Sequence, residues 1–309
     1  MFNTSDTFAY FEGKIVPFKE AKISVMNHAF NYGTAVFGGV RANWNEDKQQ
    51  LYIFRAPEHY KRLANSSHLM LMHFHERHTP DSFAAILKEM VIKSNLKEDI
   101  YFRPIVYKSS EIVGVRLHDL EDELTVYMIP LNDYVPLSGI RCGFSSWRRT
   151  SDNAIPARCK INGSYANPAF SKTEAVLNGF DEAIVTDQTG NAVEGSAENL
   201  FIIRDGIAYT PSPSSDILEG ITRNSLMQLL EDDLGVKVVE RNIGRTEIFY
   251  ADEVFLCGTG AKVAPVIEVD HRAIGSGKPG PISVKLQELY FNVVKGNVEK
   301  YKKWLTAVY

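Results

Sequence analysis

The sequence has few cysteines and no concentration of positive charge. Its three cysteines, Cys142, Cys159 and Cys257, are odd in number and widely spaced, so we expect reduced thiols rather than a disulfide framework or a CxxC metal site. The formal net charge of -4 is spread along the chain without a basic cluster, which argues against nucleic acid or an anionic membrane as a partner. Small molecules are therefore the expected ligands.

Long apolar runs are also missing. No stretch of about 18 uninterrupted apolar residues occurs, and residues 1–11 lack the basic segment and apolar run of a secretory leader, so we expect a cytoplasmic protein. Hydrophobic residues at 44% and charged residues at 23% are typical of a globular protein. A chain of 309 residues exceeds what one hydrophobic core usually supports, which favours two domains.

Strand-like runs and amphipathic helical runs alternate along the chain, which predicts an α/β fold. The expected strands are 8–11, 14–16, 36–42, 51–54, 100–107, 124–129, 140–146, 182–186, 192–203, 236–240, 254–257 and 263–269. The expected helices are two that begin near Pro57 and Ser82, then 167–177, 222–234 and a last one from Ser283. Residues 130–139 are bounded by proline and end in glycine, which is typical of a linker. We therefore place an N-terminal domain at 1–129, the linker at 130–139 and a C-terminal domain at 140–309.

Lys160 lies in the stretch Ile155-Pro-Ala-Arg-Cys-Lys-Ile-Asn-Gly-Ser-Tyr165, which has neither helical nor strand periodicity. Small residues flank it and would let a large planar group approach. A lysine by itself is nearly always a solvated surface residue, because burying its charge requires a partner or a shifted pKa. Only the surrounding motif makes Lys160 a candidate.

Two acids, Glu194 and Glu198, lie in an expected strand that is otherwise made largely of small and apolar residues. A carboxylate desolvated there is unfavourable unless an opposite charge or hydrogen-bond donors compensate it, so Glu194 implies a buried cation nearby. From the strand alone, an ion pair with an arginine explains this acid as well as a ligand does.

Gly220 precedes a helical pattern that begins with Ile221 and Thr222. Free backbone N–H groups at a helix N-terminus form an anion site, and phosphate is its usual occupant. A glycine in front of a helix is more often only a loop residue, so this segment alone is a weak signal.

Taken together in this order and spacing, the three segments resemble the signature region of the class IV aminotransferases, which are fold type IV enzymes that depend on pyridoxal 5′-phosphate. The resemblance extends from about Tyr10 to Val294 and is to the branched-chain amino acid aminotransferases in particular. It implies a small α/β N-terminal domain, a larger pseudo-barrel C-terminal domain that binds the cofactor, and a homodimer or higher homo-oligomer.

The resemblance also implies a role for each segment. Lys160 would be the catalytic residue that bonds covalently to the cofactor, and Glu194 would pair with the protonated pyridine nitrogen. Arg62, in Glu58-His-Tyr-Lys-Arg-Leu63, would hold the phosphate, for which its forked guanidinium is suited, although a solvated helix arginine is the plain alternative. The other implied cofactor contacts come from Tyr165, Leu218, Ile221, Thr222 and Thr259.

The substrate pocket is implied by the N-terminal half. Residues 31–41 resemble the branched-chain motif, in which Tyr32, Phe37 and Arg41 help to line the pocket. The other implied substrate contacts come from Tyr101, Arg103, Tyr134, Gly258 and Gly260, and the apolar half would be completed by Val40 and Leu131. Gly38 departs from the pattern, since many members of the family have an acid at this position. The loss of that acid is expected to reshape the pocket around Arg41. As a lone GxG motif, Gly258-Thr259-Gly260 is a poor dinucleotide signature, because no helix follows it.

The reaction that the resemblance implies is transamination of branched-chain L-amino acids with 2-oxoglutarate, by a ping-pong mechanism, so amino donors and keto acids are the expected small-molecule partners. An (R)-selective amine or D-amino acid transaminase of the same fold is the nearest alternative. A lyase similar to aminodeoxychorismate lyase and a catalytically silent binding protein are two others. The 32–41 segment and Arg103 favour transamination over the lyase, and the retained lysine, acid and phosphate segments disfavour a silent protein.

The run His73-Phe-His-Glu-Arg-His78 is one residue short of the HExxH pair of zinc proteins, and no set of carboxylates or cysteines accompanies it. We interpret it as an exposed loop, and we expect no metal site.

Overall fold

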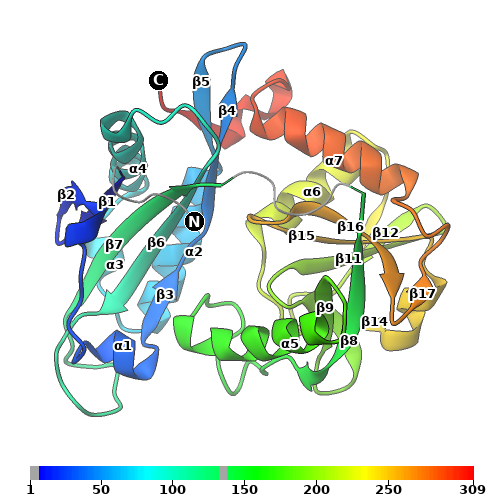
Figure 1. Cartoon of the computed structure of the whole chain (residues 1–309), viewed down its shortest axis with the longest axis horizontal. Helices are drawn as coiled ribbons and strands as arrows, with labels where there is room; N and C mark the ends of the chain where they lie inside the picture. The colour runs from blue at the N-terminus through cyan, green and yellow to red at the C-terminus, as the bar shows by residue number, and fades with distance from the viewer. Residues whose placement is uncertain (1–6, 132–137) are drawn as a thin grey trace. The chain divides into compact units, whose positions relative to one another are not determined.

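The computed structural model describes residues 7–131 and 138–309 (Figure 1). The chain forms two compact units. The first unit comprises residues 1–132, 159–163 and 292–309, and the second comprises residues 133–158 and 164–291. Since residues 132–137 lie outside the described ranges, the domain limits expected at 1–129, 130–139 and 140–309 stay a prediction.

The first unit is built on an eight-stranded sheet with the order β18-β5-β4-β6-β7-β1-β2, in which β3 pairs with β6. Its strands are β1 Phe8–Phe11, β2 Lys14–Pro17, β3 Ala35–Phe37, β4 Val40–Asn45, β5 Gln50–Phe54, β6 Ile100–Lys108, β7 Asp122–Pro130 and β18 Leu305–Ala307. Because β18 pairs with β5, residues near the end of the chain complete a sheet that the first residues begin.

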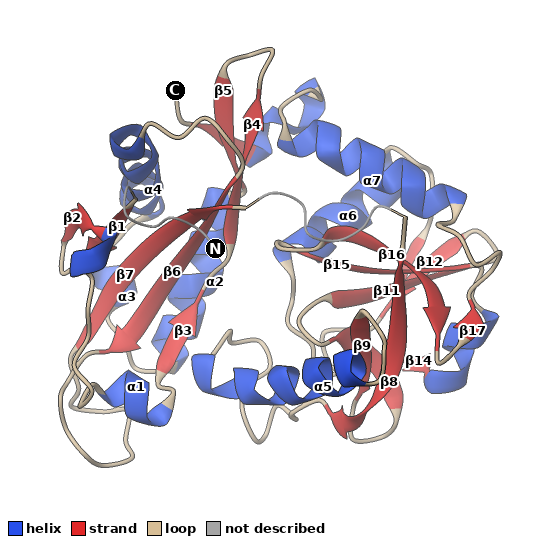
Figure 2. Ribbon diagram, in the orientation of Figure 1, coloured by secondary structure: helices blue, strands red, loops and turns tan. Residues whose placement is uncertain are grey.

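The helices of the first unit pack against this sheet (Figure 2). They are α1 His28–Tyr32, α2 Ala56–Leu69, α3 Phe74–Arg77 and α4 Pro80–Ser94, with the 3-10 helices η2 Phe18–Glu20 and η5 Glu299–Trp304. Both α2 and α4 have a proline in the first turn, where its missing N–H costs nothing. Thr79 caps α4 by accepting a hydrogen bond from the Ser82 amide at 3.2 Å, and Phe83 and Leu87 bury its apolar face.

The second unit contains a closed barrel. Within its ten-stranded sheet the order runs β13-β12-β11-β15-β16-β8-β9-β10-β14, and an additional pairing of β10 with β11 closes a ring. Its strands are β8 Ile140–Arg148, β9 Glu182–Thr186, β10 Asn191–Gly195, β11 Asn199–Arg204, β12 Ile207–Thr210, β13 Val238–Glu240, β14 Ile243–Gly244, β15 Glu253–Gly258, β16 Lys262–Val269 and β17 Arg272–Ala273. The remaining helices are η3 Asn162–Tyr165, α5 Ala166–Leu177, α6 Ile221–Asp232, η4 Arg245–Tyr250 and α7 Pro281–Val294.

The barrel strands share one apolar core that includes Cys142, Ile184, Leu200 and Leu256. Helix α5 packs against β8 and β9, and α6 packs against β15 and β13. The predicted α/β class, with a barrel in the C-terminal half, is confirmed.

The prediction of one strand over residues 36–42 is wrong, because β3 and β4 are separate. Both pair with β6, but the ladder is interrupted at Gly38 and Gly39, opposite the proline of β6. Pro104 has no N–H to donate, and its carbonyl instead accepts the Gly38 N–H at 2.8 Å. The two glycines tolerate this break, which a run of β-branched residues would not.

The prediction of one strand over residues 192–203 is also wrong, because β10 and β11 form a hairpin. Glu194 pairs with Asn199 across it, and the Gly195 N–H donates to the Glu198 carbonyl at 2.7 Å. Glu198 therefore lies in the turn and not in a strand. The signal for a turn was the Gly195-Ser196 pair.

The histidine-rich run, interpreted as an exposed loop, contains the short helix α3, which forms because Phe74 is fully buried. In the described part of the chain, no group of three or more metal-ligating side chains is placed to hold an ion. No disulfide joins the three cysteines. Within residues 7–131 and 138–309, no helix has both the length and the apolar character needed to cross a membrane.

Candidate active site

Lys160 belongs to the first unit, because residues 159–163 extend along β3. The Phe37 N–H donates to the Lys160 carbonyl at 2.9 Å, and Val36 and Ile161 form an antiparallel bridge. The lysine side chain is half-buried, and its Nζ lies 4.9 Å from the centroid of the Phe37 ring. This is an ordered setting and not that of a solvated surface lysine.

The same phenylalanine ring binds a second cation. The Arg103 guanidinium lies 4.6 Å from the Phe37 centroid, and its Nε and Nη2 donate to Tyr101 Oη at 3.1 and 2.8 Å. Burial raises the pKa of Tyr101, an effect that Arg103 opposes. Among the residues that the structure describes, no carboxylate pairs with Arg103. Lys160, Phe37, Tyr101 and Arg103 are therefore brought together as predicted, around a positive charge suited to an anion.

Arg62 is half-buried on α2. Together with Arg55 and Lys160 it contributes a positive potential at His59, whose pKa is held well below the usual range by burial first and by these three cations next. His59 is not among the residues predicted from the sequence. Its position three residues before Arg62, on the same face of a helix, is the signal that could have found it.

Arg41 and Tyr32 are fixed by backbone groups. Arg41 is buried, and its Nη2 donates to the Leu131 carbonyl at 2.9 Å. Tyr32 Oη accepts from the Gly114 N–H at 3.1 Å, and its ring packs on His28 at 4.7 Å between centroids. Both side chains thus have structural partners before any ligand is considered, and their contacts with substrate stay a prediction. Tyr134 lies outside the described residues.

The position of Gly38 is already filled by a neighbour. A Cβ atom added there would lie 2.8 Å from Pro104 Cγ, which is closer than real contacts allow. An acid at this position would therefore require Pro104 to move. The loss of the acid does not release Arg41, which remains buried and bonded to Leu131.

In the second unit, Glu194 is a buried carboxylate, and its partners include Asn199, Leu218 and Arg149. Oε1 accepts from Asn199 Nδ2 at 2.9 Å and from the Leu218 N–H at 3.0 Å, and Oε2 pairs with Arg149 Nε at 3.1 Å. The arginine ion pair that the sequence left open is therefore present. Arg149 Nε also donates a hydrogen bond to the Asp216 carbonyl at 3.1 Å, which fixes the arginine beside Glu194.

The start of α6 matches the predicted anion site. Gly220 is the N-cap residue, and no side chain caps the helix, so its first N–H groups are not satisfied in that way. Ile221 and Thr222 are the first two residues of α6, and both are buried. An added Cβ at Gly220 would lie 2.0 Å from Asn199 Oδ1, so only glycine fits beside the side chain that also holds Glu194.

The remaining predicted residues of the second unit lie at the ends of elements. Tyr165 is the N-cap residue of α5 and is half-buried. Gly258 ends β15, and Thr259 and Gly260 form the tight turn into β16 that was predicted. An added Cβ at Gly258 would be in ordinary van der Waals contact with Ala197 and Glu198, at 3.8 to 4.0 Å, so the local packing does not require glycine at this position.

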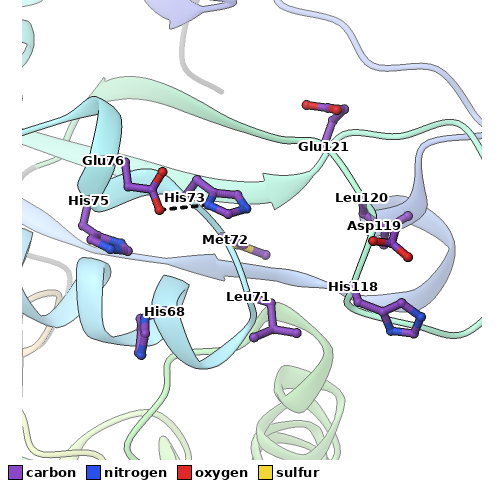
Figure 3. A pocket seen from close by; sticks show the side chains of 10 residues that line it. All are labelled: His68, Leu71, Met72, His73, His75, Glu76, His118, Asp119, Leu120 and Glu121. Carbon is purple, nitrogen blue, oxygen red and sulfur yellow. Dashed lines mark hydrogen bonds and ion pairs between the residues drawn. The ribbon is translucent and has the colours of Figure 1, made fainter.

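Two cavities lie elsewhere. One of about 540 Å³ in the first unit has none of the predicted residues in its lining (Figure 3). Its lining consists of His68, Leu71, Met72, His73, His75, Glu76, His118, Asp119, Leu120 and Glu121. The His73 ring pairs with Glu76 at 3.0 Å, whereas His118 lies apart from these two in Figure 3. The other, of about 370 Å³ in the second unit, is lined in part by Glu198, Lys172 and Glu182.

Known proteins resemble the chain over nearly its whole length. A family model for class IV amino-transferases matches residues 36–269. A probable branched-chain-amino-acid aminotransferase of Aquifex aeolicus is 50% identical over 303 residues, which cover 98% of this chain and 97% of that protein. The branched-chain aminotransferase of Thermoproteus uzoniensis, solved with norvaline, has a TM-score of 0.93 at 37% identity and covers 98% of this chain and 99% of its own. The branched-chain amino acid aminotransferase of Thermobaculum terrenum, solved in its PLP form, has a TM-score of 0.94 at 32% identity and covers 99% of this chain and 100% of its own.

The fold and these matches define the class of protein. The chain belongs to the class IV aminotransferase family. It is an enzyme, and its cofactor is pyridoxal 5′-phosphate. Within that family, it is similar to proteins named branched-chain-amino-acid aminotransferases.

Gly220→Ala should weaken the hydrogen bonds around Glu194 in the second unit. The new Cβ would displace the Asn199 side chain, which bonds to Glu194 and to Leu218. We expect a loss of about 1 to 3 kcal/mol in the free energy of unfolding and faster cofactor release. Gly244→Ala is the matched control, since Gly244 also precedes a helix with nearly the same backbone angles but has open space around it. Urea unfolding and cofactor absorbance would measure both. Equal effects of the two variants would contradict this account.

Proposed function

We propose that the chain transfers amino groups from branched-chain L-amino acids to 2-oxoglutarate in two half-reactions. The main support is Arg103, which lies over Phe37 and, within the described ranges, has no carboxylate partner. Lys160 Nζ lies over the same ring, so an amino acid whose nitrogen is at Lys160 can place a carboxylate near Arg103. The names of the relatives support the branched side chain of the donor.

The residues present fit the cofactor. A protonated pyridine nitrogen requires a carboxylate, which Glu194 supplies in a buried place. A phosphate requires N–H donors and a cation, which the uncapped start of α6 and Arg62 supply.

Pyridoxal 5′-phosphate supplies an aldehyde carbon and a ring that accepts electrons from the substrate. Lys160 would hold that carbon through its amine between turnovers, and the displaced amine would then take the proton from the substrate α-carbon as general base. Glu194 would keep the pyridine nitrogen protonated, and Leu218 would pack against the ring. Tyr165 would lie at the phenolic oxygen.

The phosphate and substrate contacts follow the same assignment. Arg62, the Ile221 and Thr222 amides and Thr259 would hold the phosphate. The substrate would be bound by Tyr32, Phe37, Arg41, Tyr101, Arg103, Tyr134, Gly258 and Gly260.

Lys160→Ala should abolish turnover, because no other amine in the motif can take the α-proton. In the unsubstituted protein, borohydride should leave the reduced cofactor on Lys160. Lys285→Ala, at an exposed position on α7, should behave as the original protein. Peptide mapping that finds the label on another lysine would refute the assignment.

Amino donors with an α-carboxylate should react much faster than amines without one, because each lost charge-assisted hydrogen bond costs about 1.5 to 3 kcal/mol, or about 10- to 150-fold in rate. The measurement is cofactor absorbance in half-reactions with L-leucine, L-glutamate, D-alanine and (R)-1-phenylethylamine. L-Leucine should lead. Equal rates for L-leucine and (R)-1-phenylethylamine would support the amine transaminase alternative and leave the cofactor assignment intact.

We also propose that two copies of the chain associate. Val25, Phe30, Val113 and Val115 are 67 to 87% exposed, and α1 is bonded to the loop of Val113 and Val115 through His28 Nε2 and the Gly114 carbonyl at 2.9 Å. An exposed apolar patch of this kind is typical of an interface. Sedimentation equilibrium should give the mass of at least two chains, and Phe30→Glu should lower it; a monomer at micromolar concentration would contradict the proposal.

We also propose a cytoplasmic location, which is consistent with the bacterial relatives that the chain resembles. Cell fractionation that found the protein only outside the cytoplasm would contradict it.

A further inference from the structure

His59 is a buried polar side chain without the partners that burial usually requires. It lies on α2 and is 4% exposed. Its Nδ1 is fully buried and has no hydrogen-bond partner among the described residues, whereas Nε2 is not enclosed in this way. An apolar side chain of similar size would fill this space without leaving a ring nitrogen unsatisfied. The histidine therefore costs stability in the chain alone, which indicates a role beyond packing.

The surroundings of His59 are positively charged. Burial, Arg62, Arg55 and Lys160, in that order, hold the pKa of the imidazole well below its ordinary value, so the ring is neutral near pH 7. Arg55 has its own partners: its Nε pairs with Glu58 at 2.8 Å, and its guanidinium lies 4.6 Å from the Trp304 ring. Arg62 lies one helical turn beyond His59, on the same face of α2. The potential that disfavours a proton on His59 favours an anion beside it.

A neutral imidazole has one donor and one acceptor nitrogen. A buried N–H without an acceptor is rarer in proteins than an unfilled lone pair, so the proton belongs on Nε2 and the lone pair on the buried Nδ1. Nε2–H is then a hydrogen-bond donor in a region of positive potential. A group of this kind suits a phosphate oxygen, because it adds a directional bond without adding a further charge.

We propose that His59 donates a hydrogen bond from Nε2 to the phosphate of the bound cofactor, beside Arg62. This inference rests on the proposed function, which assigns the phosphate to Arg62. His59 is thus a binding residue and takes no part in proton transfer.

Three variants of the holoenzyme test whether His59 Nε2 donates this hydrogen bond. His59→Gln keeps an N–H donor near the place of Nε2, His59→Asn keeps one near the place of Nδ1, and His59→Leu removes both. Cofactor release into a carbonyl scavenger should be about tenfold or more faster for the Leu and Asn variants, because a hydrogen bond to a charged group is lost. The Gln variant should remain within about threefold of the original protein. If the Leu variant does not fold, the difference in cofactor release between the Gln and Asn variants tests the proposal, since both carry a polar amide side chain.

Two further readouts separate this role from a structural one. The ³¹P resonance of the bound cofactor should shift in the Leu and Asn variants but not in the Gln variant. Pyridoxal, which lacks the phosphate, should leave all of these proteins at the same rate. Equal acceleration of pyridoxal and pyridoxal phosphate release, or an Asn variant that matches Gln, would overturn the proposal.

Arg62→Ala distinguishes a failure of the His59 proposal from a failure of the proposed phosphate site. If this variant releases the cofactor faster while His59→Leu does not, the inference on His59 fails and the proposed phosphate site stands. If Arg62→Ala and His59→Leu both release the cofactor at the original rate, the proposed phosphate site itself fails.

Discussion

A buried carboxylate has to be compensated, and the compensation of Glu194 organises the second unit. Asn199 lies opposite Glu194 in the β10–β11 hairpin, the pairing that closes the barrel, and its amide donates both to Glu194 and to the Leu218 carbonyl. The Leu218 N–H returns a bond to the same carboxylate. One charge therefore joins the closure of the barrel to the loop that leads into α6, and the crowding at Gly220 follows from it.

In the first unit, by contrast, several cationic side chains lie close together. Phe37 has Lys160 and Arg103 against its ring, and Arg62 acts with Lys160 on the potential at His59. These charges come together because β3 and residues 159–163 pair along their backbones. A positive potential of this kind favours anions. An aminotransferase binds two, the phosphate of its cofactor and the carboxylate of its substrate.

Sequence patterns predicted the helices and strands in which apolar residues recur with a regular spacing. The strand at residues 182–186 and the helices α2, α4 and α5 lie within a few residues of the expected limits, because alternation and helical spacing reflect one buried face. The breaks at Gly38 and at the 195–198 turn were missed, since apolar residues continue on both sides of each break. Only the partner strand, with Pro104 opposite Gly38, shows where the ladder stops.

The predicted site was limited in a similar way. Motif spacing singled out Lys160, Glu194 and the start of α6, but it could not name Arg149 or Asn199 as the partners of Glu194. Those contacts join residues far apart along the chain or across a hairpin, and no period in the sequence encodes them. His59 was missed for a different reason. Its place one helical turn before Arg62 is a weak signal, and only its burial and its charged neighbours give that place a meaning.

Gly38 affects the surroundings of Arg103 through the proline next to it in sequence. A carboxylate at this position would need the space that the Pro104 ring occupies, next in sequence to Arg103. With glycine there, Arg103 is oriented by stacking on Phe37 and by hydrogen bonds to Tyr101, none of which neutralises its charge. Arg41 stays buried against Leu131, so the departure from the common family pattern does not release this side chain. Since no carboxylate in the described part of the chain pairs with Arg103, a carboxylate of the ligand can do so, which favours amino acids and keto acids over simple amines.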